Sequence, residues 1–384
     1  MIDEAALLAS VDKYSVVGLL QELIRIPSTN PPGNELEVAG LLKDHLAGHG
    51  IEADMRIYDG TRANLIARVP GRGSGPDLVF SAHMDTGPVG EAPWTHSPFS
   101  GTLYEGKVYG RGAADMKSGI AAMVQAATVL AHSGLELSGD LVLAFSYDES
   151  HGLQGAKRMV EEGVLRGAGA LLVSEPSGMD VFVAEKGALW LQCVAKGKGA
   201  HTSMPQLGKN AILEMAHFLA RLESSLDLSA VQHPLLGEAT WSVGTIKGGV
   251  TINLIPDHCE VELDLRLVPP TDPDDAIRRV KELGEGRIKV QKLDWMEPVE
   301  TDPQEDIVLI SLGAVKEVTG VPCQPKGVSY FSDGCVLANR LDIPMVIIGP
   351  ADATMTHQPD EHVEVSRLVQ ALKTYVLIAA RYLA

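Results

Sequence analysis

In five places along this chain, an apolar run ends in residues that can bind a metal ion. The segments are Ser81-Ala-His-Met-Asp85, Gly110-Arg-Gly-Ala-Ala-Asp115, Ser146-Tyr-Asp-Glu149, Val173-Ser-Glu175 and Met355-Thr-His-Gln-Pro-Asp-Glu361. Histidine and carboxylate side chains are common zinc ligands, and binding and catalytic residues gather on the loops of a rigid scaffold. One such segment means little, but five favour a fold that brings strand ends together around a metal-dependent hydrolytic site.

Strand-like and helical segments alternate through the first half of the chain. Apolar runs typical of strands cover residues 64–69, 78–82, 140–146 and 170–174, and helical spacing covers residues 14–26, 35–49, 116–132 and 153–162. This alternation predicts an α/β domain with a mostly parallel sheet and ligands at its carboxyl edge. Residues 101–112 are rich in turn formers and predict a hairpin or a loop.

The pattern changes after Glu175. Strand-like runs at 188–196, 240–247 and 258–267 are interleaved with helical spacing at 210–226 and 273–283. A strand-helix-strand-strand-helix-strand order predicts a small α+β domain of the ferredoxin-like kind. Because 384 residues exceed one ordinary core, we expect a catalytic domain of residues 1–185 and 294–384, with an inserted domain of residues 186–293.

Composition excludes several classes of partner. The chain is 45% apolar and 21% charged, with a net charge of −18, which argues against nucleic acid and anionic membrane surfaces. No apolar run approaches the about 18 residues of a membrane span, and the acidic N-terminus is unlike a signal peptide. A cytoplasmic location with reduced thiols is expected, because the four cysteines are widely spaced at Cys193, Cys259, Cys323 and Cys335.

Each candidate ligand also has a structural interpretation. A single histidine after a strand is more often structural, but Asp85 follows His83 at a spacing that lets its carboxylate orient the imidazole. Asp115 can be a helix N-cap, a site residue, or both. Glu175 ends a strand before Pro176, a costly place for an unpaired charge. His357 lies in a polar loop after the apolar run 344–349.

Asp148 and Glu149 follow the apolar run 141–145 and precede Gly152. They can form an ordinary charged loop. Alternatively, a carboxylate at this strand end can act as a general base that takes a proton from water at a metal site.

The order His-x-Asp, Gly-Arg-Gly-x-x-Asp-x-Lys-x-Gly, Asp-Glu, Ser-Glu-Pro and His-x-Pro-x-Glu resembles the M20 family of metallopeptidases and amidohydrolases. The resemblance covers nearly the whole chain and implies a zinc-hydrolase catalytic domain with an inserted dimerisation or lid domain. It implies that His83, Asp115 and Glu175 hold one metal ion, and that Asp115 bridges to a second ion held partly by His357. It also implies a supporting role for Asp85, a general base at Glu149 and a cis peptide bond between Asp115 and Met116.

The inserted region carries further marks of the family. Gly197-Lys-Gly-Ala-His201 resembles the segment whose histidine reaches the active site of a second subunit, which implies a homodimer and an oxyanion role for His201. Asn253 and Arg266 resemble substrate-binding positions. Arg266 could bind a substrate carboxylate through two hydrogen bonds, or it could be a surface residue at a strand end.

One position departs from the family pattern. The family usually shows Asp-Glu-Glu, where the last glutamate binds the second metal, but this chain reads Asp148-Glu149-Ser150. A hydroxyl is a poor zinc ligand. The second site could therefore be weak or empty, His151 could replace the missing ligand, or Ser150 could hold a water that completes the shell. We favour a weakened second site.

The function expected from these features is hydrolysis of an N-acyl or peptide bond next to a free carboxylate, with one or two zinc ions (cobalt or manganese being possible). The leading expectation is deacylation of an N-acyl-amino acid, of the acetylornithine or succinyl-diaminopimelate kind. The alternatives are a dipeptidase or carboxypeptidase, a divergent one-metal amidohydrolase acting on another carbon–nitrogen bond, and a catalytically silent ligand-binding relative. The partners expected are a small acyl-amino-acid or dipeptide substrate and a second copy of the chain.

Overall fold

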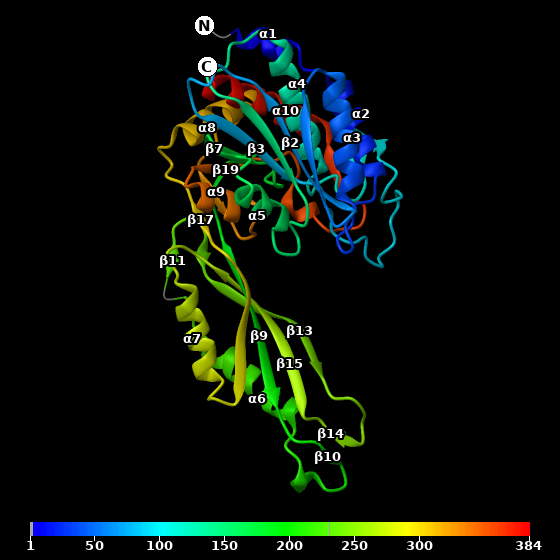
Figure 1. The fold of residues 1–384 in the computed structure, drawn as a ribbon, viewed down its shortest axis with the longest axis vertical. Coiled ribbons are helices and arrows are strands. Elements are labelled where there is room, and N and C mark those ends of the chain that lie inside the picture. Colours follow the sequence, from blue (N-terminus) through cyan, green and yellow to red (C-terminus); the bar gives the residue numbers. More distant parts are fainter. Residues whose placement is uncertain (1–2, 230) are drawn as a thin grey trace. The chain divides into compact units, whose positions relative to one another are not determined.

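The computed structural model describes residues 3–229 and 231–384. The chain divides into two compact units (Figure 1). The first, here called the α/β unit, runs to Ala184 and resumes over Glu300–Gly327 and Ser332–Ala384. The second, here called the inserted unit, comprises Glu185–Val299 and Val328–Phe331.

A nine-stranded mixed sheet forms the centre of the α/β fold, in the order β1-β2-β6-β3-β7-β19-β8-β17, with β18 paired to β8. The four central strands β6, β3, β7 and β19 are parallel, whereas β1–β2, β2–β6 and β19–β8 are antiparallel. The mostly parallel sheet that the sequence predicts is therefore confined to the centre. The bounds are β1 (Ala53–Tyr58), β2 (Arg62–Val69), β3 (Asp77–His83), β6 (Leu141–Ser146), β7 (Ala168–Val173), β8 (Phe182–Glu185), β17 (Val299–Glu300), β18 (Lys326–Val328) and β19 (Met345–Ile347).

Helices cover both faces of this sheet. Every residue of β6 is therefore buried, whichever face its side chain lies on. Helix α4 packs on β3 and β6 and is flanked by α2 and α10, while α5 and α9 pack on each other and contact β2, β6 and β7. The helices are α1 (Glu4–Ala9), α2 (Lys13–Arg25), α3 (Glu35–Gly48), α4 (Lys117–His132), α5 (Gln154–Glu161), α8 (Asp306–Thr319), α9 (Gly334–Leu341) and α10 (Val365–Tyr382), with a 3-10 turn at Ala353–Met355. None of the helices in residues 3–229 and 231–384 combines the length and the hydropathy of a transmembrane span.

A small three-stranded sheet lies beside this core, in the order β20-β5-β4. The turn-rich segment at 101–112 forms its β4–β5 hairpin, as one of the two expected outcomes. The bounds are β4 (Thr102–Tyr104), β5 (Lys107–Tyr109) and β20 (His362–Glu364).

Parallel pairing places the carboxyl ends of β3, β6, β7 and β19 at one edge of the sheet. Two segments pack so closely on the end of β7 that they have room only for glycine. A Cβ atom on Gly119 of α4 would lie 2.1 Å from Ser174 Oγ, and one on Gly349 would lie 2.2 Å from the carbonyl oxygen of Glu175. Glycine at these two positions therefore lets α4 and the loop after β19 approach the segment that carries Glu175.

The inserted unit is a four-stranded antiparallel sheet, ordered β13-β15-β9-β16, with α6 and α7 packed on it. Its β-α-β-β-α-β order is the expected ferredoxin-like arrangement. The predicted segment 186–293 lies within this unit, which continues past Leu293 because β16 pairs with β9 as far as Met296. The bounds are β9 (Gly187–Lys196), β10 (Ala200–His201), α6 (Ala211–Ser225), β11 (Gln232–His233), β12 (Gly237–Glu238), β13 (Thr240–Gly248), β14 (Leu254–Ile255), β15 (His258–Leu267), α7 (Pro273–Leu283) and β16 (Ile288–Met296), with a 3-10 turn at Pro205–Leu207.

The core of the inserted unit depends on Phe218, a fully buried residue of α6. Replacing it with alanine removes a large apolar side chain and leaves a cavity, so the free energy of unfolding of this unit should fall by roughly 3–5 kcal/mol. Denaturant unfolding measures the loss, with His217→Ala as the control on the exposed face of the same helix. Equal effects of the two substitutions would contradict the assigned core.

Candidate active site

Three predicted metal ligands lie together at the carboxyl edge of the sheet. His83 ends β3, Glu175 follows β7, and Asp115 lies just before α4. One nitrogen or oxygen atom of each lies within 4.8 Å of the others. His83 Nε2 is 3.0 Å from Asp115 Oδ1 and 3.6 Å from Glu175 Oε1. One imidazole and two carboxylates are a donor set that fits zinc, so the residues suit the metal that the sequence predicts.

His357 approaches Asp115 from its other oxygen. Its Nε2 lies 3.4 Å from Asp115 Oδ2, whereas His83 faces Oδ1. The imidazole of His357 is 61% exposed, and Gly87 lies so close to it that an added Cβ would be 2.8 Å from Nε2. Asp115 therefore lies between two histidines, which is the arrangement that a bridging carboxylate requires.

The loop that carries Asp115 is held by Glu361, a buried residue to which the sequence assigned no role. One carboxylate oxygen of Glu361 accepts hydrogen bonds from the backbone N–H groups of Gly112, Ala114 and Asp115. Its other oxygen pairs with the buried guanidinium of Arg111. Burial nevertheless raises the pKa of Glu361 to about 7. The last glutamate of the His-x-Pro-x-Glu pattern was the available signal for this residue.

The peptide bond between Asp115 and Met116 is cis, as the resemblance implies. The alternative interpretation of Asp115 as a helix N-cap is wrong, because the residue that caps α4 is Met116. The carboxylate of Asp115 faces the two histidines instead.

Asp85 fixes the orientation of His83. The Nδ1 atom of His83 lies 2.9 Å from the carbonyl oxygen of Asp85 and 3.3 Å from its Oδ1. Two acceptors at Nδ1 favour a proton on that nitrogen, which leaves the lone pair of Nε2 directed at Asp115 and Glu175. Burial would raise the pKa of Asp85, but hydrogen bonds with His83, Asn30 and Ser150 outweigh burial and hold this pKa well below its usual range.

The electrostatic balance of the cluster favours a cation. Burial disfavours the charged imidazole of His83, but Glu175, Asp115 and Asp85 outweigh it and raise the pKa of His83 well above its usual value. Asp115 is held ionised in the same way, because contacts with His357 and His83 lower its pKa against the effect of burial. A buried histidine held protonated by surrounding carboxylates marks a site where a metal ion can replace the proton.

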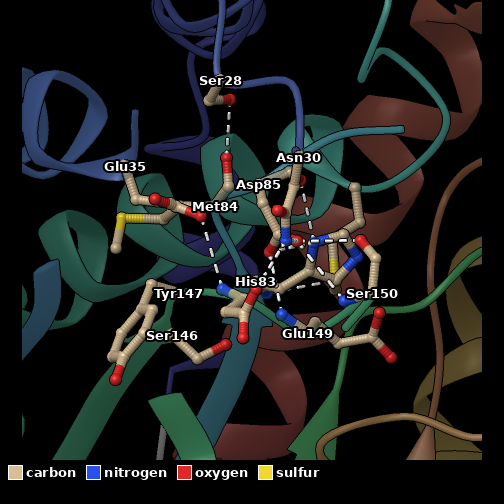
Figure 2. A network of polar contacts seen from close by, with 12 residues as sticks. Ser28, Asn30, Glu35, His83, Met84, Asp85, Ser146, Tyr147, Glu149 and Ser150 are labelled. Carbon is tan, nitrogen blue, oxygen red and sulfur yellow. Dashed lines mark hydrogen bonds and ion pairs between the residues drawn. The ribbon is translucent and has the colours of Figure 1, made fainter. Parts of the chain in front are cut away.

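Glu149 follows β6, and its carboxylate points away from Asp85 (Figure 2). Burial raises the pKa of Glu149 well above its usual value, and repulsion from Glu175, Asp333 and Asp85 adds to the effect, while His83 opposes it. A carboxyl group with a raised pKa beside a group of metal ligands is suited to accept and return a proton near neutral pH.

Asp333 is a buried acid near this loop, and sequence reasoning missed it. It accepts a hydrogen bond from the hydroxyl of Ser146, at the end of β6. Burial raises the pKa of Asp333 to about 6. Its position in the loop before α9 shows no local pattern that could have identified it.

Ser150 donates its hydrogen bonds to Asp85. Its backbone N–H and its hydroxyl donate to Asp85 Oδ2 over 3.3 and 2.8 Å, and the backbone N–H of Glu149 donates to Asp85 Oδ1 over 3.1 Å (Figure 2). In the part of the chain that the structure describes, the group of potential ligands comprises His83, Asp115 and Glu175.

The other predicted site residues lie in the inserted unit. His201 in β10 is exposed, with its Nδ1 2.7 Å from Ser203 Oγ. Asn253 lies on the neighbouring segment, where its carbonyl oxygen accepts a hydrogen bond from the backbone N–H of Thr202 over 3.3 Å.

Arg266, in β15, is half-buried. Its Nε and Nη2 donate to Asp264 Oδ2 over 3.1 and 2.9 Å, and its guanidinium carbon lies 4.8 Å from the centre of the Phe331 ring. The substrate and oxyanion roles of His201, Asn253 and Arg266 stay predictions.

Known proteins resemble this chain over its full length. A succinyl-diaminopimelate desuccinylase from Pseudoalteromonas atlantica is 31% identical over 386 residues, covering 96% of this chain and 99% of the relative. A metallo-carboxypeptidase of the M20 family from Sulfolobus solfataricus has the same fold, with a TM-score of 0.80 at 20% identity over 100% of this chain and 99% of that one. A dinuclear metal-binding peptidase from Bacillus subtilis matches with a TM-score of 0.73 at 19% identity over 97% and 98% of the two chains.

The sequence comparison agrees with the geometry of the site. Residues 79–381, which include every predicted metal ligand, match peptidase family M20/M25/M40 as a whole. The relative at 31% identity supports the same assignment over nearly the entire chain. The chain therefore belongs to peptidase family M20/M25/M40 and is a metal-dependent hydrolase of amide or peptide bonds.

Proposed function

We propose that this protein is a zinc-dependent deacylase, which hydrolyses the amide bond of a small N-acyl-amino acid that bears a free carboxylate. The observation that carries the proposal is the cluster of His83, Asp115 and Glu175 with the half-buried acid Glu149 on the loop after the neighbouring strand β6. A metal-ligand group beside an acid of raised pKa is the combination that amide hydrolysis by activated water requires.

His83, Asp115 and Glu175 would hold the zinc ion, with His357 on the far oxygen of Asp115. When bound, zinc acts as a Lewis acid and lowers the pKa of water. Glu149 takes a proton from the attacking water while the oxygen of that water adds to the carbonyl carbon of the substrate. Glu149 then returns that proton to the amide nitrogen as the carbon–nitrogen bond breaks, so the amine leaves neutral and the carboxylic acid forms.

The residues of the inserted unit complete the proposed mechanism. His201 would stabilise the oxyanion of the tetrahedral intermediate by donating a hydrogen bond. Arg266 would bind the substrate carboxylate, with Asn253 beside it, because an arginine pairs with a carboxylate through two parallel hydrogen bonds. Aspartate pairing and the Phe331 ring restrict the guanidinium of Arg266, which supports a fixed role over that of a mobile surface residue.

We propose about one tightly held zinc ion per chain, because a tetrahedral zinc site needs ligands that the second position lacks. The hydroxyl of Ser150 is engaged with Asp85, so the residue at the family's usual carboxylate position is directed elsewhere. The relative from Bacillus subtilis, by contrast, is described as dinuclear. Cobalt or manganese could replace zinc in this site, because each accepts histidine and carboxylate ligands.

An N-succinyl-amino acid is the leading substrate, because the relative at 31% identity is a succinyl-diaminopimelate desuccinylase. The likeness to a metallo-carboxypeptidase supports peptide cleavage as the second candidate. We place the activity in the cytoplasm, where the four free cysteines stay reduced.

Turnover of the zinc-loaded protein on N-succinyl-diaminopimelate, N-acetyl-amino acids and dipeptides separates these functions. The proposal expects the highest kcat/KM on an N-acyl-amino acid. A preference for dipeptides would make the protein a peptidase. Binding of these compounds without any turnover would make it a silent ligand-binding relative and overturn the proposal.

We also propose that the inserted unit forms a homodimer. Its edge strand β13 is exposed along almost its whole length, and long exposed edges normally need a partner. Large apolar side chains on the same unit are also exposed, among them Ile212, Leu213, Val243, Ile246, Val250 and Ile252. An exposed apolar patch of this kind is typical of an interaction surface.

The substitution Ile246→Glu tests the dimer. A charge on the edge strand would have to be buried in the interface, so the protein should become a monomer in sedimentation experiments at micromolar concentration. Turnover should fall in parallel, because the proposed role of His201 depends on the second subunit. Tyr14→Glu, at a side chain that is 83% exposed on the α/β unit, is the control. A monomeric wild-type protein with full activity would contradict this proposal.

A further inference from the structure

The carboxylate of Asp85 is fully buried and takes part in more contacts than orienting His83 requires. Its Oδ2 accepts hydrogen bonds from the hydroxyl of Ser150 over 2.8 Å and from the side-chain amide of Asn30 over 2.9 Å. Its Oδ1 accepts the backbone N–H of Glu149 over 3.1 Å while also facing His83. One carboxylate therefore connects a metal ligand to the loop that carries the general base (Figure 2).

Asn30 ties this carboxylate to the start of the same loop. Its Nδ2 donates to Asp85 Oδ2 over 2.9 Å and to Asp148 Oδ1 over 2.8 Å, and only 1% of Asn30 is exposed. The backbone holds Asn30 in place, because its N–H donates to the carbonyl of Thr86 and the N–H of Thr86 donates to the carbonyl of Ser28, over 2.8 and 2.9 Å. Both the backbone and the side-chain NH2 group of Asn30 are therefore held by hydrogen bonds.

Arg62, in β2, contacts the oxygen of the Asn30 amide. Its Nη2 donates to Asn30 Oδ1 over 3.0 Å, and its Nη1 lies 2.8 Å from Glu35 Oε1 and 3.2 Å from Asp148 Oδ1. The guanidinium fills the space beside Gly33, where an added Cβ would lie 2.4 Å from Cζ. Because the Oδ1 of Asn30 accepts from a cation, its NH2 group is the end that must face the two carboxylates.

These contacts stabilise an unusual backbone conformation in the loop that carries Asp148 and Glu149. Asp148 has a φ of 59°, in the left-handed region that non-glycine residues seldom adopt. Such a conformation persists only where surrounding contacts determine it. The contacts that do so here are those of Asn30 and Arg62 to Asp148, and of Ser150 to Asp85.

We propose that Asn30 and Ser150 are positioning residues that act through Asp85, fixing the Glu149 loop against the His83 ligand. Ser150 thereby replaces the second-metal ligand of the family with a hydrogen bond that aligns the general base. This inference rests on the proposed function only for the role of Glu149. The link from Asn30 through Asp85 to His83 concerns metal binding and can be measured without any substrate.

The test compares Ser150→Ala, Ser150→Thr and Asn30→Ala with wild type. Asn34→Ala is the matched control, because Asn34 lies in the same loop and its side chain does not cap α3. Each protein is loaded with cobalt in place of zinc, and metal affinity, the visible absorption spectrum and thermal unfolding are recorded. kcat and KM on the best N-acyl-amino acid are measured on the zinc-loaded forms.

Ser150→Ala should lower kcat about tenfold with KM nearly unchanged, and Ser150→Thr should restore most of the rate because it keeps the hydroxyl. The cobalt spectrum of Ser150→Ala should match that of wild type, because Ser150 is not a ligand. Asn30→Ala should weaken cobalt binding and lower kcat, each by about 10- to 100-fold. A double variant that combines Asn30→Ala and Ser150→Ala should lose less kcat than the product of the two single losses, because both side chains donate to one oxygen of Asp85.

A changed cobalt spectrum or a lower metal content in Ser150→Ala would make Ser150 a ligand and overturn the inference. So would a wild-type kcat in Ser150→Ala, or metal binding in Asn30→Ala that equals Asn34→Ala. If Asn30→Ala does not fold, the alanine and threonine variants of Ser150 decide the matter. A wild-type protein that binds cobalt but hydrolyses no amide would contradict the proposed function, while weaker cobalt binding in Asn30→Ala would still support this link.

Discussion

Replacing Glu149 with glutamine is expected to lower kcat by roughly 10³-fold, within the range typical of lost general base catalysis. Glutamine has nearly the same shape as glutamate but cannot take a proton from water or return it to the leaving amine. Metal content should stay at the wild-type level, because Glu149 does not belong to the ligand group of His83, Asp115 and Glu175.

Steady-state kinetics and elemental analysis on the same protein samples measure this result. The pH profile gives an independent readout. Glu149 must be ionised to act as a base and its pKa is raised, so wild-type kcat should fall as the pH falls through that pKa. The residual rate of Glu149→Gln should lack this acidic limb. Glu161→Gln, an exposed charge on α5, is the control. A loss of less than about tenfold, or a parallel loss of metal, would contradict the role of base.

Replacing His83 with alanine is expected to abolish tight metal binding. The substitution removes the only imidazole of the ligand group and leaves Asp115 and Glu175 close together and partly buried. Loss of a residue that merely supports a ligand already costs 10- to 100-fold in metal affinity, so loss of a ligand should cost more than about 100-fold. Activity should be lost with the metal.

Metal competition against a chelator of known affinity measures this effect. His217→Ala removes an exposed histidine from α6 and should bind metal like wild type. Unchanged metal content in His83→Ala would show that the metal lies elsewhere, and the assignment of the site would then be wrong.

The strand-end residues of the site were accessible from sequence because their signals are local. His83 and Glu175 each end an apolar run, and Glu149 follows another. The strands that carry them are adjacent and parallel, so three separate local patterns meet at one edge. Asp115 belongs to the same set of candidate segments in the sequence, but in the structure it does not end a strand of the sheet and lies just before α4.

The residues that support the site could not be predicted, because their contacts join distant parts of the chain. Glu361 accepts the backbone N–H of Asp115 from 246 positions away, and Asn30 contacts Asp148 from 118 positions away. Nothing in the local sequence of Asn30 or Arg62 indicates a partner. Such contacts depend on the order of strands in the sheet, which hydrophobic periodicity does not encode.

The same limit applies to the sheet itself. Alternating strands and helices predicted the parallel centre, but the antiparallel outer strands depend on short turns such as the one between β1 and β2. The sequence identified Ser150 as a departure from the family pattern and left three outcomes open. The contact with Asp85 arises from the fold, and it favours the interpretation in which the second metal site is weak.

The most direct test of the central claim is a zinc titration of the metal-free protein, followed by the rate of hydrolysis of an N-succinyl-amino acid. The rate should be negligible without zinc, rise in proportion to added metal and reach a plateau at about one zinc per chain. A plateau at two zinc ions per chain would contradict the account of Ser150. Full turnover without metal, or no turnover at any ratio, would contradict the assignment of His83, Asp115, Glu175 and Glu149 as a zinc-dependent hydrolytic site.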